Sequence, residues 1–162
     1  MGKPLYERLG FRVSTRYGVF RREQTLTRSE GRDGSIVPGA EHGESMLELD
    51  RQATGEQRQR LLTPAFGSAR VVVDGNGLRG FYLPELGEGL VVAKDPDAGA
   101  ALLQLRCSAV EPVRLPVDNV GGIAWLKGNG FRECGHVTRM TDGLDLGYHP
   151  EWIYSRIGGN FG

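Results

Sequence analysis

The sequence repeats one short corner, and this repeat constrains the fold more than any other feature. The tripeptide Gly-Phe-Arg at positions 10–12 recurs at positions 130–132. Each copy follows a helix-like segment that ends at a glycine, and each precedes an extended run with partial alternation of apolar residues. The two copies thus share the three residues and also the predicted helix before them and the predicted strand after them. We therefore interpret them as an internal repeat of one helix-to-strand unit.

The strongest local signal lies between the two copies, in the run ARVVVDGNGLRGFYL. Two strand-like halves flank the turn 74–77, in which glycine and asparagine are expected to supply positive φ, so the run predicts a β-hairpin. A strand at 89–94 follows, and then a helix that Asp95 caps and Pro96 begins. Before the hairpin, Ser45 and Thr54 are predicted to cap two short helices.

After the helix behind Asp95, the pattern predicts a strand, a glycine-rich helix and a last long strand. Hairpins come first along the chain and crossover connections come later. This order predicts an α/β (α+β) fold, with a mixed, mostly antiparallel central sheet that carries helices on both faces.

The charge balance argues against several classes of partner. Twenty basic and twenty acidic residues leave no net charge, so no long-range field attracts phosphate backbones or anionic lipid. The apolar runs are too short to span a bilayer, and the first residues lack the apolar core of a secretory signal. We therefore expect a cytoplasmic protein with no nucleic-acid or membrane partner. No metal is expected either, because Cys134 and His136 lack a third ligand at metal spacing.

The two corners resemble a known family. LYERLGFR at 5–12 resembles the end of the fourth helix and the sixth strand of GNAT acetyltransferases, in which Leu-Tyr precedes Gly-Phe. NVGGIAWLKGNGFR at 119–132 is similar to the same element again, with Trp-Leu in place of Leu-Tyr. The resemblance implies that residues 1–22 are the terminal helix and strand of a first, truncated GNAT domain. Residues 23–44 would then be a linker and 45–162 a GNAT-like domain, as in bacterial proteins that carry two such domains in tandem.

The resemblance also implies an activity. It implies an acetyl-CoA-dependent N-acetyltransferase that transfers an acetyl group to a primary amine of a small molecule or peptide. In this family a strand receives the pantetheine, and the next helix offers backbone N–H groups to the pyrophosphate. The residues implied for acetyl-CoA binding are Val91, Val92, Ala93, Lys94, Gly99 and Asn119. Tyr6 stands where the family carries the acid that protonates the departing thiolate. A homodimer is left open.

Several residues depart from the family pattern. Leu126 replaces the tyrosine in the second copy and cannot donate a proton. Asp95 and Asp97 place negative charge where the pyrophosphate would bind, and Pro96 removes an N–H donor. Asn119 is equally a helix N-cap. These departures support an alternative, a non-catalytic GNAT-like module for acceptor binding or dimerisation.

The first helix of the second domain carries three further candidates. Glu48, Asp50 and Arg51 belong to a region that lines acceptor pockets in related folds. A solvated helix face is the alternative for these three residues.

Overall fold

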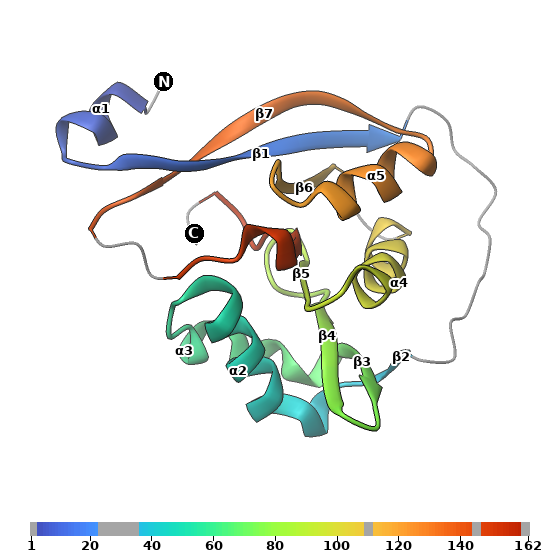
Figure 1. Cartoon of the computed structure of the whole chain (residues 1–162). Coiled ribbons are helices and arrows are strands. Elements are labelled where there is room, and N and C mark those ends of the chain that lie inside the picture. Colours follow the sequence, from blue (N-terminus) through green and yellow to red (C-terminus); the bar gives the residue numbers. More distant parts are fainter. Residues whose placement is uncertain (1–2, 23–35, 109–111, 144–146, 160–162) are drawn as a thin grey trace.

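The computed structural model describes residues 3–22, 36–108, 112–143 and 147–159, and Figure 1 shows how their elements are arranged. The helices are α1 (Lys3–Arg8), α2 (Gly43–Thr54), α3 (Gln59–Leu62), α4 (Pro96–Cys107) and α5 (Val120–Gly128). The strands are β1 (Arg12–Arg22), β2 (Ile36–Pro38), β3 (Arg70–Asp74), β4 (Gly77–Leu83), β5 (Leu90–Ala93), β6 (Val113–Pro116), β7 (Phe131–Thr141) and β8 (Ile153–Ser155). From α2 to β7 the elements follow the predicted order, and the predicted fold class is confirmed.

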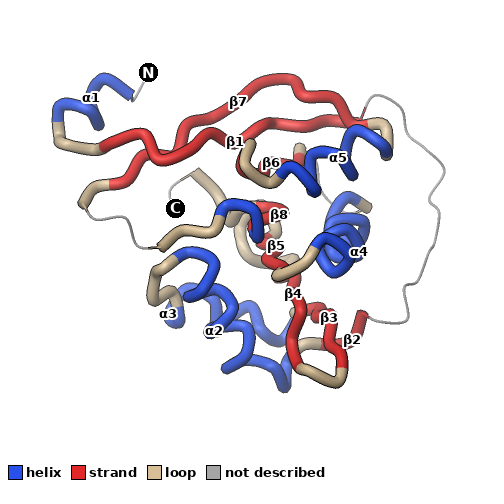
Figure 2. Tube along the Cα trace, in the orientation of Figure 1, coloured by secondary structure: helices blue, strands red, loops and turns tan. Residues whose placement is uncertain are grey.

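Five strands form one antiparallel sheet in the order β2-β3-β4-β5-β8. Neighbouring side chains along these strands point to opposite faces of the sheet. Val71, Phe81 and Val92 belong to one core cluster, which includes buried residues of α2 and α3. The alternate residues Val72 and Val91 belong to a second cluster, which includes buried residues of α4 and α5. The sheet therefore separates two layers of helices, as Figure 2 shows.

A second sheet has three antiparallel strands in the order β6-β1-β7. β1 pairs with β7 along its whole length, from Arg12 opposite Thr141 to Arg22 opposite Phe131. Its other edge pairs with β6, where Tyr17 lies opposite Pro116 and Phe20 lies opposite Val113. Because Phe20 is fully buried in the cluster shared with α4, the strand after the first corner is integrated into the same body as the second corner.

The local capping predictions divide into confirmed and wrong ones. Asp95 caps α4, since its side chain accepts from the Ala98 N–H at 3.0 Å, and Pro96 is the first residue of that helix. The predicted hairpin is also present, although only Gly77 takes a positive φ, of 111°. The predictions for Ser45 and Thr54 are wrong, because α2 begins at Gly43 and includes Thr54, and the residue before α3 is Arg58.

Two short strands were not predicted. β2 lies inside the region assigned to a linker, and residues 23–35 of that region lie outside the described residues. β8 follows a 3-10 turn at Pro150–Trp152 and pairs antiparallel with β5. It also reaches the other sheet, because the Arg156 N–H donates to the Arg114 carbonyl of β6 at 3.2 Å. β8 therefore joins the two sheets.

Candidate functional site

β5 is the strand that the resemblance assigns to pantetheine binding. β8 lies between β5 and β6, pairing with β5 and contacting β6 (Figure 2). Val91 and Val92 of β5 pair with β4 on one edge and with β8 on the other, opposite Ser155 and Ile153. Their backbone groups are therefore engaged by the protein itself on both edges of the strand.

Tyr154 of β8 covers the first turn of α4. A Cβ atom added at Gly99 would overlap three ring atoms of Tyr154, because it would lie well within 3.0 Å of each. Tyr154 is itself buried, and this burial raises the pKa of its phenol to about 12. The missing side chain at Gly99 therefore allows the tyrosine ring to approach the helix backbone closely.

The N-terminus of α4 is electrostatically satisfied within the chain. Asp95 accepts from the Ala98 N–H, and Arg79 binds the same carboxylate through Nε at 3.0 Å and Nη2 at 2.6 Å. Burial alone would raise the pKa of Asp95, but the hydrogen bonds from Arg79, Ala98 and Asp97 lower it. The carboxylate therefore takes the place that an external anion would occupy at this helix end.

Asn119 and Leu126 have internal roles as well. The Asn119 side chain accepts from the Gly122 N–H at 2.7 Å and donates to the Ile153 carbonyl at 3.0 Å, so it caps α5 and holds the start of β8. Leu126 is fully buried in the cluster around α4 and α5. Of the six residues proposed for acetyl-CoA, only Lys94 is exposed.

These contacts decide how well acetyl-CoA fits this unit. β8 pairs along the strand edge needed for pantetheine, Tyr154 covers the glycine, and Asp95 neutralises the helix N-terminus. The residues present between β5 and β6 therefore do not fit the pantetheine and pyrophosphate of acetyl-CoA in this conformation.

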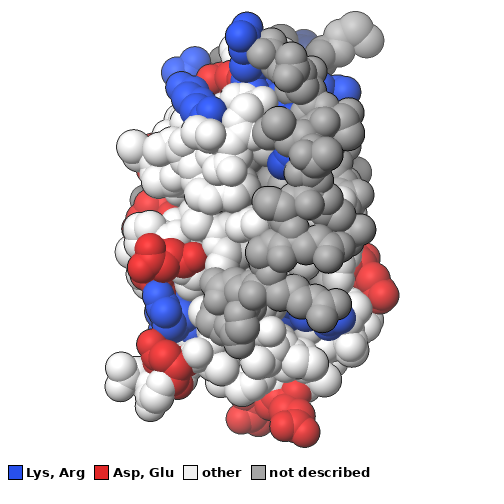
Figure 3. All heavy atoms as spheres, turned by 90° about the vertical axis from the view of Figure 1, so that its right-hand side faces the viewer, with Lys and Arg blue, Asp and Glu red and all other residues white. Residues whose placement is uncertain are grey.

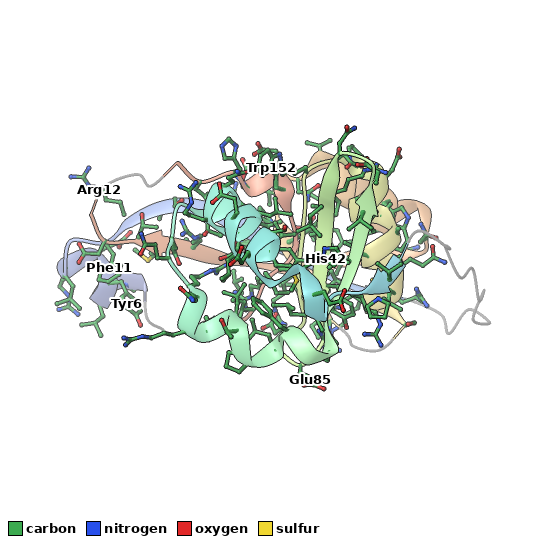
Figure 4. The ribbon with its side chains drawn as sticks, turned by 90° about the horizontal axis from the view of Figure 1, so that it is seen from below. Tyr6, Phe11, Arg12, His42, Glu85 and Trp152 are labelled. Atoms are coloured by element: carbon green, nitrogen blue, oxygen red, sulfur yellow. The ribbon has the colours of Figure 1, made fainter. Side chains whose placement is uncertain are left out.

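Tyr6 lies far from this place. It projects from α1, is 46% exposed and contacts Phe11 edge to face, with 5.2 Å between the ring centroids. In Figure 4, Tyr6, Phe11 and Arg12 lie together at one end of the molecule, away from Trp152 and His42. The structure therefore does not bring Tyr6 together with the six residues proposed for acetyl-CoA.

A shallow hollow of about 400 Å³ opens beside α2. It is lined by Glu44, Ser45, Glu48 and Leu49 of α2, by Asn76, Gly77 and Leu78 of the hairpin, and by Lys94. Hydrogen bonds from Arg51 and Gln52 lower the pKa of Glu48 to about 2, so this carboxylate is ionised at neutral pH. The hollow thus presents the carboxylates of Glu44 and Glu48 together with the ammonium group of Lys94, and Glu48 is already paired with Arg51.

Asp50, the third candidate on α2, is buried and does not line this hollow. Its carboxylate is bound by Arg58 through Nε at 3.0 Å and through a second, shorter contact from Nη2. Desolvation alone would lower the pKa of Arg58, but the bond to Asp50 raises it. This buried ion pair fixes the loop between α2 and α3.

A polar cluster that was not predicted lies where β1, β7 and residue 148 meet. The hydroxyl groups of Tyr17 and Tyr148 lie 2.8 Å apart, and burial raises the pKa of both phenols. The Arg139 guanidinium lies 4.2 Å from the ring centroid of Tyr148 and binds Glu56 at 3.3 Å. Tyr17 and Tyr148 are 131 positions apart in the sequence, and Glu56 and Arg139 are 83 positions apart. No local sequence pattern could therefore have indicated these contacts.

The described surface carries both signs of charge. Figure 3 shows Lys or Arg and Asp or Glu interspersed on the visible face. In the described ranges, no helix has both the length and the apolar character that a bilayer crossing requires. Over the same ranges, no group of three His, Cys, Asp or Glu side chains gathers as metal ligands would.

Comparison with known proteins agrees with the resemblance. Residues 46–155 match the family model of the acetyltransferase (GNAT) domain. A solved structure of a candidate acetyltransferase from Pyrococcus horikoshii is similar in fold, with a TM-score of 0.75 and 22% sequence identity. The match covers 97% of this chain and 55% of that chain, so this chain spans about half the length of that protein. No curated protein matches the chain. Since the family model covers most of the sequence, the chain belongs to the GNAT acetyltransferase family.

Proposed function

We propose that this chain takes part in acetyl-CoA-dependent transfer of an acetyl group to a primary amine, and that its own GNAT unit serves acceptor binding rather than acetyl-CoA binding. Membership of the acetyltransferase family supports the reaction class. The observation that carries the second half of the proposal is the position of β8, whose Tyr154 lies on Gly99. Acetyl-CoA would then be bound by another GNAT unit.

The hollow beside α2 supports the role in acceptor binding. A primary amine is protonated at neutral pH, and the hollow offers it two carboxylates, Glu44 and the Arg51-paired Glu48, against one like charge, Lys94. The hydrogen bonds that Arg51 and Gln52 make to Glu48 hold its carboxylate in one orientation. A carboxylate that is already held in place loses little conformational entropy when it binds an amine.

Isothermal titration calorimetry with acetyl-CoA tests the proposal. The wild-type chain is expected to give no saturable heat with millimolar acetyl-CoA, because the gap between β5 and β6 is filled by β8. The matched variant is Lys94→Glu, which changes an exposed residue implied in pyrophosphate binding without entering the core. Saturable binding by the wild-type chain that Lys94→Glu weakens would contradict the proposal.

Saturable binding could also arise if β8 leaves the edge of β5, and a second measurement detects this movement. If acetyl-CoA displaces β8, the fluorescence of Trp152, which adjoins the strand, should change with the same midpoint as the heat when it is read in a Trp125→Phe variant. The proposal requires that neither signal appears.

A further inference from the structure

The outer edge of β7 is open among the described residues, whereas β1 is paired on both edges. β7 is eleven residues long, and most of its side chains are exposed. A long strand edge with unpaired N–H and C=O groups is a surface on which another strand can add. The repeat in the sequence identifies which strand would fit.

The pairing of β1 with β7 follows an approximate two-fold symmetry. In the repeat, Arg12 corresponds to Arg132, Tyr17 to Val137 and Arg21 to Thr141. Tyr17 pairs with Val137, so this position lies opposite its own equivalent. Arg12 pairs with Thr141 and Arg21 pairs with Arg132, and the repeat exchanges these two pairs. A rotation about the centre of the strand pair therefore superposes each corner on the other.

The same rotation carries β6 onto the open edge of β7. β6 pairs with residues 17–20 of β1, from Tyr17 opposite Pro116 to Phe20 opposite Val113. The equivalent positions on β7 are residues 137–140. A strand related to β6 by the two-fold would therefore pair antiparallel with residues 137–140.

Equivalent side chains of the two corners differ in how far they are buried. Leu126 of α5 is fully buried and Phe131 is 2% exposed. Tyr6, the equivalent of Leu126, is 46% exposed, and Leu5, the equivalent of the partly buried Trp125, is 53% exposed. The residues that β6 and α4 cover in the second corner thus lie open in the first, where α1 projects from the body (Figure 1).

We propose that α1 and residues 137–140 of β7 form a docking surface for another GNAT unit, whose strand equivalent to β6 adds to β7 and covers Leu5 and Tyr6. The identification of the partner as a GNAT unit rests on the proposed function, while its position rests on the strand register alone. The Pyrococcus protein, of which this chain spans 55%, has enough length for such a unit.

A second copy of this chain is a poor occupant of the surface. In each copy the strand Val113–Pro116 already pairs with its own β1 and also contacts β8. Such a copy would have to lose its own sheet before offering β6 to a neighbour. The surface therefore fits a GNAT unit whose strand equivalent to β6 is still unpaired.

A strand peptide provides a direct probe on the intact chain. The peptide PVELPVDN copies residues 112–119 with Arg114→Glu, because residue 114 would lie opposite Arg139 and like charges across a strand pair repel. Nuclear magnetic resonance of the ¹⁵N-labelled chain is expected to give saturable shift changes at residues 137–140 and in α1. Tyr6→Asp, with Leu5→Asp as the second variant, should weaken the peptide at least about tenfold, because each buries a charge under the added strand.

Leu9→Asp is the matched control. Leu9 directly follows the same helix and is 62% exposed. Its equivalent Asn129 is exposed too, so no covering segment is expected there and the affinity should not change. The proposal is overturned by an absence of saturable change at millimolar peptide, or by binding at β2, the open edge of the other sheet. It is also overturned if light scattering shows that the chain dimerises by itself and the resonances of residues 137–140 shift as its concentration is raised. No acetyl-CoA is present, so failure here leaves the calorimetric test unaffected.

Discussion

Replacing Gly99 by alanine tests whether Tyr154 really occupies the first turn of α4. In an open helix, alanine is more favourable than glycine by about 1 kcal/mol. Here the added methyl group would overlap three atoms of a buried ring, and overpacking of a filled core costs about 1–3 kcal/mol. Because the overlap involves three ring atoms, we expect the upper end of that cost and a net loss of about 2 kcal/mol. For a chain of this size, this loss lowers the melting temperature by about 4–8 °C.

Thermal and urea denaturation of paired variants would measure this loss. Gly128→Ala is the control, because Gly128 ends α5 and an added Cβ there meets nothing within 4 Å. The cost of Gly99→Ala should shrink in a Tyr154→Ala background, which would give a coupling energy between the two positions. A Gly99→Ala chain as stable as the wild type would refute the reasoning, since the first turn of α4 would then be open.

Three further predictions concern stability. Burial raises the pKa of Tyr17 and Tyr148 and raises that of Tyr154 to about 12, so the folded chain keeps these protons above the pH at which the unfolded chain loses them. Stability should be complete below about pH 10 and then fall, by up to about 1.4 kcal/mol per pH unit for each tyrosine, until the pH reaches its folded pKa. Equal urea midpoints at pH 8 and pH 11 would contradict this. Asp50→Asn should cost about 3–5 kcal/mol in urea denaturation because it leaves the buried Arg58 uncompensated, whereas Glu48→Gln, at an exposed pair, should leave the melting temperature unchanged. Phe20→Ala should cost about 3–5 kcal/mol if β1 is part of the core, and Val13→Ala, on the exposed part of β1, is its control in the same assay.

The elements that could be predicted are those whose cause is local. The hairpin depends on a turn with Gly77 between two runs of strand-forming residues, and the start of α4 depends on Asp95 followed by Pro96. In each case the sequence neighbours supply the hydrogen bonds or the backbone conformation. β8 could not be predicted in this way, because it has three residues and its partner strand lies about 60 positions earlier.

The candidate site shows a different limit of prediction. The resemblance to GNAT acetyltransferases implies Gly99 and Asn119 as contacts of acetyl-CoA. The same chemistry also serves close packing: Gly99 admits the ring of Tyr154, and Asn119 donates to the carbonyl of Ile153. Whether a ligand or the chain itself uses such groups depends on a segment far along the sequence, and residue types alone do not indicate it.

The two corners have similar sequences but different surroundings, and their geometry explains the difference. In both, a glycine with positive φ lies two residues after the helix, 93° at Gly10 and 79° at Gly130, and the chain continues into an eleven-residue strand. The backbone conformation of the two corners is therefore similar. They differ in what packs on them, since residues of β6 and α4 pack on the second corner. Because the pairing of β1 with β7 is close to two-fold, any unit that covers the first corner equivalently must approach from the far edge of β7. The exposure of Leu5 and Tyr6 and the unpaired edge of β7 thus have the same cause: among the described residues, no strand occupies the position on β7 that β6 occupies on β1.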